Sequence, residues 1–110
     1  TSLKELDLGR NQIVSIDSLK ELTELEYVNL SYNKIENIES LQDKDLSKLG
    51  LENNKIKDIS SLYGMYNLSR LWIDRNLILK PHMDKFKGYI EVNKIGVKLL
   101  SDVDELFYIT

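Results

Sequence analysis

Apolar residues recur along most of the chain in a pattern that repeats about every 22 positions. Each copy has three apolar residues at spacings of three and two, then an asparagine three positions later and an isoleucine two positions beyond it. The apolar triplets are Leu3, Leu6 and Leu8; Leu25, Val28 and Leu30; Leu46, Leu49 and Leu51; and Leu68, Leu71 and Ile73. A repeat of this length predicts stacked copies of one small structural unit that share a continuous core.

Each copy also predicts its own local structure. Leu6 and Leu8 alternate with Glu5, Asp7 and Gly9, and this alternation predicts a short strand with its apolar side facing inward. After the asparagine, apolar residues fall three apart, which favours a tight 3-10 turn over a long α-helix. Consecutive strands then run in the same direction with a return segment between them, so the sequence predicts a parallel sheet.

Polar residues recur in register as well. A side-chain amide at the end of each strand can hydrogen-bond loop backbone groups, so we expect a structural ladder of Asn11, Asn33, Asn54 and Asn76. Each convex turn is expected to be capped by a serine, at Ser18, Ser40 and Ser61. The second copy is one residue shorter than the others, and Lys44 occupies the slot that is apolar in its neighbours.

The resulting consensus, LxxLxLxxNxIxxIxxL, resembles the leucine-rich repeat family over residues 3 to 78. The 22-residue class of this family occurs in bacterial internalins and in an intracellular regulator of protein phosphatase 1. The resemblance implies an α/β solenoid, a right-handed coil with a parallel concave β-sheet, short 3-10 or helical convex segments and a C-terminal cap. It divides the chain into four leucine-rich repeats at 1–78 and a cap at 79–110.

The two ends of the chain carry further expectations. Thr1 begins directly on a repeat, so we expect either that the repeats are the C-terminal part of a longer array or that another chain covers the first coil. Pro81 to Lys87 is predicted to form a short helix closed by Gly88. Alternation from Tyr89 to Leu100, around a turn at 93–96, predicts a hairpin, whereas 101–110 fits either a helix or a strand.

Composition and charge exclude several classes of function. The chain is 42% apolar and 30% charged, the balance of an ordinary globular domain, and its net charge is −3 with no basic stripe. Nucleic-acid binding is therefore not expected. Apolar runs are far shorter than the roughly 18 residues that cross a bilayer, so membrane insertion is not expected either.

The sequence also predicts that the protein is not an enzyme and needs no cofactor. It contains no cysteine, one histidine at position 82, and no glycine-rich phosphate-binding motif. His82 is predicted to face solvent or to pack in the cap. Asp102, Asp104 and Glu105 lack the glycine and the spacing of a calcium loop, so no metal site is predicted.

Polar and aromatic residues on the outward side of the strands form the candidate site. Aromatic residues and arginines anchor many protein interfaces, so we expect binding of another protein by the concave face. The predicted partner-binding residues are Glu5, Asp7, Tyr27, Asn29, Tyr32, Lys48, Arg70, Trp72 and Asp74. The resemblance to internalins implies a bacterial surface protein.

Four alternatives remain open at this stage. The protein can be an intracellular scaffold or phosphatase-regulator-like module that uses the same face. It can bind a glycan, with sugar rings stacked on Tyr27, Tyr32 and Trp72. Trp72 can also serve only to cover the sheet next to Gly50, or the whole segment can be a spacer within a longer array.

Overall fold

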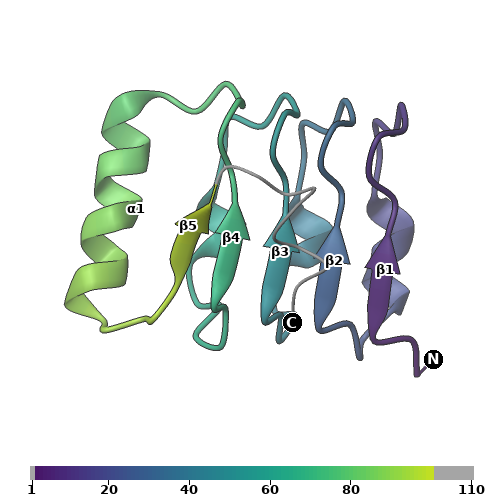
Figure 1. Cartoon of the computed structure of the whole chain (residues 1–110), viewed down its shortest axis with the longest axis horizontal. Coiled ribbons are helices and arrows are strands. Elements are labelled where there is room, and N and C mark those ends of the chain that lie inside the picture. Colours follow the sequence, from purple (N-terminus) through teal and green to yellow (C-terminus); the bar gives the residue numbers. More distant parts are fainter. Residues whose placement is uncertain (1, 101–110) are drawn as a thin grey trace.

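Five short parallel strands, one from each coil of the chain, form a single open sheet (Figure 1). The computed structural model describes residues 2–100. The strands follow sequence order across the sheet and are β1 Glu5–Asp7, β2 Tyr27–Asn29, β3 Lys48–Gly50, β4 Arg70–Trp72 and β5 Lys98–Leu100. This arrangement confirms the predicted leucine-rich-repeat solenoid.

The register of the sheet stacks equivalent residues of successive coils. Leu6 pairs with Val28, Val28 with Leu49, Leu49 with Leu71 and Leu71 with Leu99. The three central residues of this column are fully buried, as are Ile35 and Ile56, which follow the asparagines of the second and third coils. One continuous core therefore runs through the stack, as the spacing of the leucines predicts.

Short 3-10 helices form the convex side: η1 Asp17–Glu21, η2 Glu39–Leu41 and η3 Ser60–Leu62. The prediction that serines cap these turns is wrong. Ser40 is buried, and its hydroxyl donates to the Ile16 carbonyl of the preceding coil at 2.8 Å. Side chains two positions earlier accept hydrogen bonds from backbone N–H groups of the turns. The Glu39 N–H donates to Asn37 Oδ1 at 2.8 Å, and the Ser60 N–H donates to Asp58 Oδ1 at 2.9 Å.

The asparagines predicted to form a ladder hydrogen-bond backbone groups after the strands, and Asn54 illustrates the geometry. Asn54 Nδ2 donates to the Leu51 carbonyl of its own coil and to the Leu30 carbonyl of the preceding coil, each at 3.1 Å. Its Oδ1 accepts the Ile35 N–H at 3.0 Å. Asn33 and Asn76 make the same three kinds of contact. Each amide thereby ties two neighbouring coils together through groups that would otherwise lack partners.

Lys44 occupies the apolar slot of the shortened second copy. The side chain is buried, and its Nζ donates to the Leu22 carbonyl of the preceding coil at 2.8 Å. Burial is the main cause that lowers the pKa of Lys44, and the nearby charge of Glu21 opposes the shift. The neighbouring Asp43 adopts a positive φ of 66°, as does the equivalent Gly64 of the next copy with 92°.

The cap differs from the sequence-based expectation. Helix α1 spans Lys80–Val92 and therefore continues through Gly88, which does not adopt a positive φ. Phe86 is buried, and Tyr89 packs at 4.5 Å from the ring centroid of Tyr63, so aromatic contacts on both sides of the glycine favour a continuous helix. The predicted hairpin is wrong, since 89–92 is helical and β5 pairs parallel with β4.

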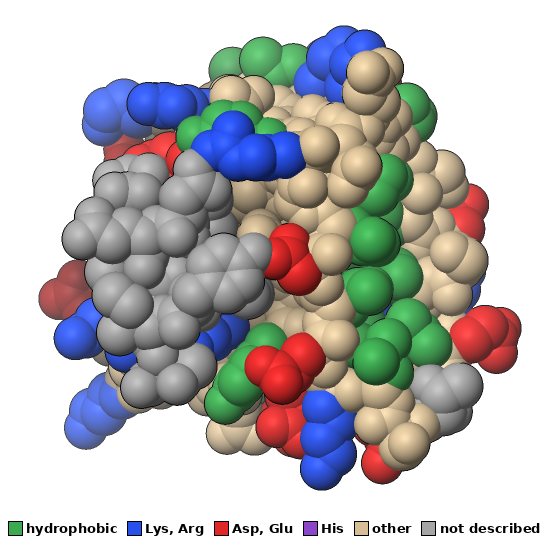
Figure 2. All heavy atoms as spheres, turned by 45° about the vertical axis from the view of Figure 1, so that its right-hand side comes forward, with side chains coloured by type: hydrophobic (Ala, Val, Ile, Leu, Met, Phe, Trp, Pro, Cys, Tyr) green, Lys and Arg blue, Asp and Glu red, His purple; other side chains and the backbone are tan. Residues whose placement is uncertain are grey.

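Apolar side chains also lie on the outer side of the first coil. Figure 2, turned so that the β1 end comes forward, shows them as a stripe down this face. Leu3 and Val14 are exposed, and Leu6, Leu8 and Ile13 are half-buried. Within the described chain, β1 has a neighbouring strand on one side only.

Residues 101–110, including Asp102, Asp104 and Glu105, lie outside the described residues, so the predictions made for them stay predictions.

Between residues 2 and 100, no helix has the length and apolar character needed to cross a membrane.

Candidate binding surface

The outward residues of the sheet form rows that cross the five strands. The register places Glu5, Tyr27, Lys48, Arg70 and Lys98 in the first row. The second row contains Asp7, Asn29, Gly50, Trp72 and Leu100. Just beyond the strands, the residues before the ladder asparagines form an edge row of Arg10, Tyr32, Asn53 and Arg75. These rows contain every predicted site residue except Asp74, which directly precedes Arg75 of the edge row.

Trp72 was expected to face solvent, but the structure buries it. Its relative exposure is 0%, and it forms a small apolar cluster with the partly buried Tyr27, Tyr32 and Leu100. Leu100 reaches this position because β5 continues the sheet, which the hairpin prediction did not include. Trp72 is thus a packing residue, and its ring is not available as a stacking platform for a sugar.

Asn29 is also buried, with 6% exposure, and belongs to a polar network within the sheet. Its Nδ2 donates to Asp7 Oδ1 at 3.0 Å, and its Oδ1 accepts the Ser31 N–H at 3.1 Å. Ser31 Oγ in turn accepts the Glu52 N–H at 3.0 Å. The centre of the face is therefore an internally bonded network, in which Asn29 has a structural role.

Three cations occupy adjacent positions of the first row. Lys48 is 6% exposed, and its Nζ lies 4.9 Å from the ring centroid of Tyr27. Burial is the largest cause that lowers the pKa of Lys48; the neighbouring Arg70 adds to the shift, and Glu5 opposes it. Lys98 extends the row and is exposed. Sequence reasoning missed Lys98 because it placed this residue in a hairpin.

All four residues of the edge row adopt the left-handed backbone conformation. Their φ angles are 58° at Arg10, 62° at Tyr32, 57° at Asn53 and 60° at Arg75. Asparagine tolerates this region, whereas arginine and tyrosine occupy it at a cost of about 1–2 kcal/mol. Each of these four coils turns after its strand through a residue in the left-handed region, and only Asn53 is of a type that this region favours.

Three side chains of the edge row converge, although they come from the first, second and fourth coils. The guanidinium carbon of Arg10 lies 4.3 Å from the ring centroid of Tyr32, and Arg75 Nη1 lies 3.3 Å from the Tyr32 hydroxyl. That hydroxyl donates to Glu52 Oε2 at 2.9 Å. We call Arg10, Tyr32 and Arg75, with the supporting Glu52, the edge cluster.

The hydrogen bond to Glu52 is the main cause that raises the pKa of Tyr32, while the charges of Arg75 and Arg10 act against the shift. Arg10 and Arg75 are exposed, Tyr32 is half-buried and Glu52 is buried. Of these four residues the sequence-based site included only Tyr32, although the register of the repeats places Arg10 and Arg75 along the same edge.

Chemically, this face offers cations, an aromatic ring and hydrogen-bonding groups. Glu5, Asp7 and Asp74 add exposed carboxylates around it. Among residues 2–100 no group of three histidine, aspartate or glutamate side chains is arranged to hold a metal ion. The arrangement suits recognition of another molecule.

Comparison with known proteins agrees with this architecture. The family profile described as Leucine Rich repeats (2 copies) matches residues 1–43. Solved leucine-rich repeat structures extend the likeness over most of the chain. The chain carries leucine-rich repeats and shares the solenoid fold of these leucine-rich repeat proteins. No curated protein matches this leucine-rich repeat sequence.

Three solved structures give the scale of the similarity. An internalin (inlF) from Listeria monocytogenes is 26% identical, with a TM-score of 0.78 over 91% of this chain. Internalin C2 (inlC2) from the same species is 33% identical, with a TM-score of 0.62 over 72%. A leucine-rich repeat protein of Leptospira interrogans is 26% identical, with a TM-score of 0.70 over 89%. The present leucine-rich repeat chain spans 29%, 36% and 25% of these three chains.

Proposed function

We propose that this chain is a non-catalytic protein-binding module that uses the concave face, with the edge cluster as its anchor. The observation that carries the proposal is the convergence of Arg10, Tyr32 and Arg75, each with a positive φ, on one exposed part of the face. The likeness to internalins supports a bacterial surface protein as its setting.

The backbone conformation of the edge cluster supports a role for its side chains. Asn53 meets the same turn with a residue that suits it, so the fold does not require arginine or tyrosine there. Strained residues concentrate at binding sites, where side-chain chemistry outweighs the conformational cost. Arginine and tyrosine are also the residues most enriched among the strongest contacts of protein interfaces.

The charges of the edge cluster indicate the chemistry of the partner. Two exposed guanidinium groups flank one aromatic ring, and each presents several N–H donors in a planar fork. Carboxylates match this geometry with paired hydrogen bonds. We therefore expect the partner protein to present aspartate or glutamate side chains to this edge of the sheet.

Glycan binding receives less support than protein binding. The expectation of glycan binding rested on three aromatic rings on which sugars could stack. Trp72, the largest of them, is buried. Tyr27 and Tyr32 are half-buried and both pack against it.

A capture experiment with matched variants tests the proposal. The immobilised wild-type chain is compared with an Arg10→Asn/Arg75→Asn variant and with a control, Lys20→Asn/Lys87→Asn, that removes two exposed charges from η1 and α1. Material from bacterial surface fractions and host extracts is the source of partners. We expect a partner protein that the wild type and the control retain, and that the edge variant binds at least about tenfold more weakly. A partner that all three chains bind equally would contradict the proposal.

A further inference from the structure

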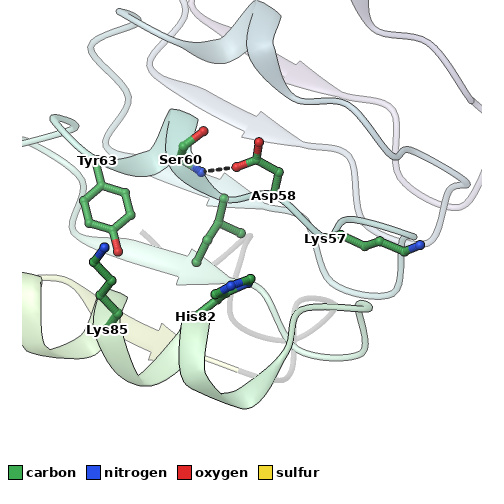
Figure 3. A pocket seen from close by; sticks show the side chains of 7 residues that line it. Lys57, Asp58, Ser60, Tyr63, His82 and Lys85 are labelled. Atoms are coloured by element: carbon green, nitrogen blue, oxygen red, sulfur yellow. Dashed lines mark hydrogen bonds between the residues drawn. The ribbon is translucent and has the colours of Figure 1, made fainter.

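A hollow of about 560 Å³ lies on the opposite side of the molecule from the sheet face, between η3 and α1 (Figure 3). Ile59 and Tyr63 form its apolar part, and Asp58, Ser60, His82 and Lys85 lie around it. None of these residues takes part in the edge cluster. We call this feature the convex hollow.

The hollow arises where the repeat pattern changes. In the first three coils a compact 3-10 helix fills this layer, and successive turns stack on one another. In the fourth coil α1 takes this place, and Pro81 occupies the position that corresponds to Ile59. A helix of 13 residues is wider and longer than a 3-10 turn, so it does not nest against η3 as another turn would.

The apolar part of the hollow is rigidly supported. The Tyr63 ring packs edge-on against Phe86 at a centroid distance of 5.3 Å and lies 4.5 Å from the ring of Tyr89. Tyr89 Oη also accepts the Gly64 N–H at 3.0 Å, which fixes the segment after η3 to the helix. The apolar surface is therefore present before any ligand arrives, which lowers the entropic cost of binding.

Hydrogen-bond donors dominate the rim. In Figure 3 the Lys85 ammonium and the Tyr63 hydroxyl point toward each other at one end, and His82 lies farther along the same helix. Asp58 is the carboxylate of the rim, and it is turned to the Ser60 N–H, which it accepts at 2.9 Å. This hydrogen bond is the main cause that lowers the pKa of Asp58. Lys57 and Lys85 bring two positive charges to the lining against the one negative charge of Asp58, so the lining is basic on balance and favours an anion.

We propose that the convex hollow binds an acidic segment of a protein partner, which inserts one aromatic or aliphatic side chain and places a neighbouring carboxylate against Lys85 and the Tyr63 hydroxyl. The apolar floor supplies the contact area, and the basic rim selects the charge. This site is separate from the concave face and adds a second contact surface to the module.

Titration of the ¹⁵N-labelled chain with short peptides, followed by NMR, tests the inference. The probe is acetyl-Glu-Phe-Glu-amide, compared with its uncharged Gln-Phe-Gln and its alanine-centred Glu-Ala-Glu counterparts. We expect amide shifts grouped around Tyr63, His82 and Lys85, and tighter binding of the first peptide than of either analogue. The Arg10→Asn/Arg75→Asn variant should give the same shifts, so this result is independent of the proposed concave-face function.

Charge reversal in the hollow completes the test. Lys85 is exposed, so Lys85→Glu should leave the fold intact and weaken the peptide about five- to tenfold. Lys34→Glu, an equal change two coils away, is the control and should have no effect. Shifts that lie elsewhere, equal binding of all three peptides, or equal weakening by both variants would overturn the proposal.

Discussion

The guanidinium carbon of Arg10 lies 4.3 Å from the ring centroid of Tyr32, although both residues occupy the left-handed backbone region. They stand at equivalent positions of neighbouring coils, directly before the ladder asparagines Asn11 and Asn33. A cation above an aromatic face contributes about 0.5–1 kcal/mol at an exposed site, which is no larger than the cost of either backbone conformation. The contact alone therefore does not account for these residues, and under the proposed function the binding of a partner supplies the reason for them.

Replacing the strained arginines is expected to stabilise the free protein. Arg10→Asn and Arg75→Asn should each raise the free energy of unfolding by about 0.5–1 kcal/mol, because asparagine suits the left-handed region and the lost contacts are exposed. Urea unfolding measures the change. Lys20→Asn, at a residue without a positive φ, is the control and should give no gain. Destabilisation at both arginine sites would mean that their contacts outweigh the strain.

The asparagine ladder should contribute unequally along the stack. Asn54 is buried and makes hydrogen bonds to two coils, whereas Asn11 is exposed and bonds only within the first coil. Asn54→Ala leaves several buried backbone groups without partners and should cost about 3 kcal/mol or more, against about 1 kcal/mol for Asn11→Ala. Equal losses in urea unfolding would contradict the ladder as the link between coils.

The sequence predicted the regular part of the fold because each coil needs its neighbours. Three apolar residues at fixed spacing cannot be buried by one coil alone, so the positions of Val28, Leu49 and Leu71 determine both the stack and its register. Asn54 is predictable for a similar reason, since backbone groups at the end of each strand require a partner. The face that carries the candidate site follows from the same alternation.

Other features depend on contacts that no local pattern reports. Gly88 stands within a helix because Phe86 and Tyr89 pack on Tyr63, and this tertiary contact overrides the local preference of glycine. Trp72 is buried with Leu100, which reaches it only because the last strand extends the sheet. Tyr32 and Arg75 meet from coils that are not adjacent in sequence.

Two glycines should respond in opposite directions to alanine. At Gly88 an added Cβ meets no atom within 4 Å, and alanine is the better helix former, so Gly88→Ala should stabilise the protein by about 0.5–1 kcal/mol. At Gly50 the Cβ would lie 2.6 Å from Asn29 Oδ1, which is fixed by its bond to Ser31, so Gly50→Ala should cost about 1–3 kcal/mol. Thermal unfolding of both variants measures this, and a loss of stability at Gly88 would argue for the shorter helix.

The buried Lys44 gives a pH-dependent prediction. Its pKa is lowered in the folded state, so the unfolded chain binds the proton more tightly and the wild type gains stability as the pH rises toward the ordinary lysine value of about 10.4. Lys44→Met fills the apolar slot without a charge and should be about 1 kcal/mol more stable at pH 7. Urea unfolding at pH 7 and pH 10 should show this advantage shrink. An advantage that grows with pH would contradict the assigned cause.

Site-specific photocrosslinking tests the central claim most directly. A benzoylphenylalanine is placed at Asp74, which is exposed on the concave face beside Arg75, or at Glu39, which is exposed on the convex η2. Both chains are irradiated with the partner identified by capture. Protein binding through the concave face predicts a crosslinked product from position 74 that free wild-type chain suppresses, and none from position 39. A product from position 39 alone would contradict the concave face as the binding surface.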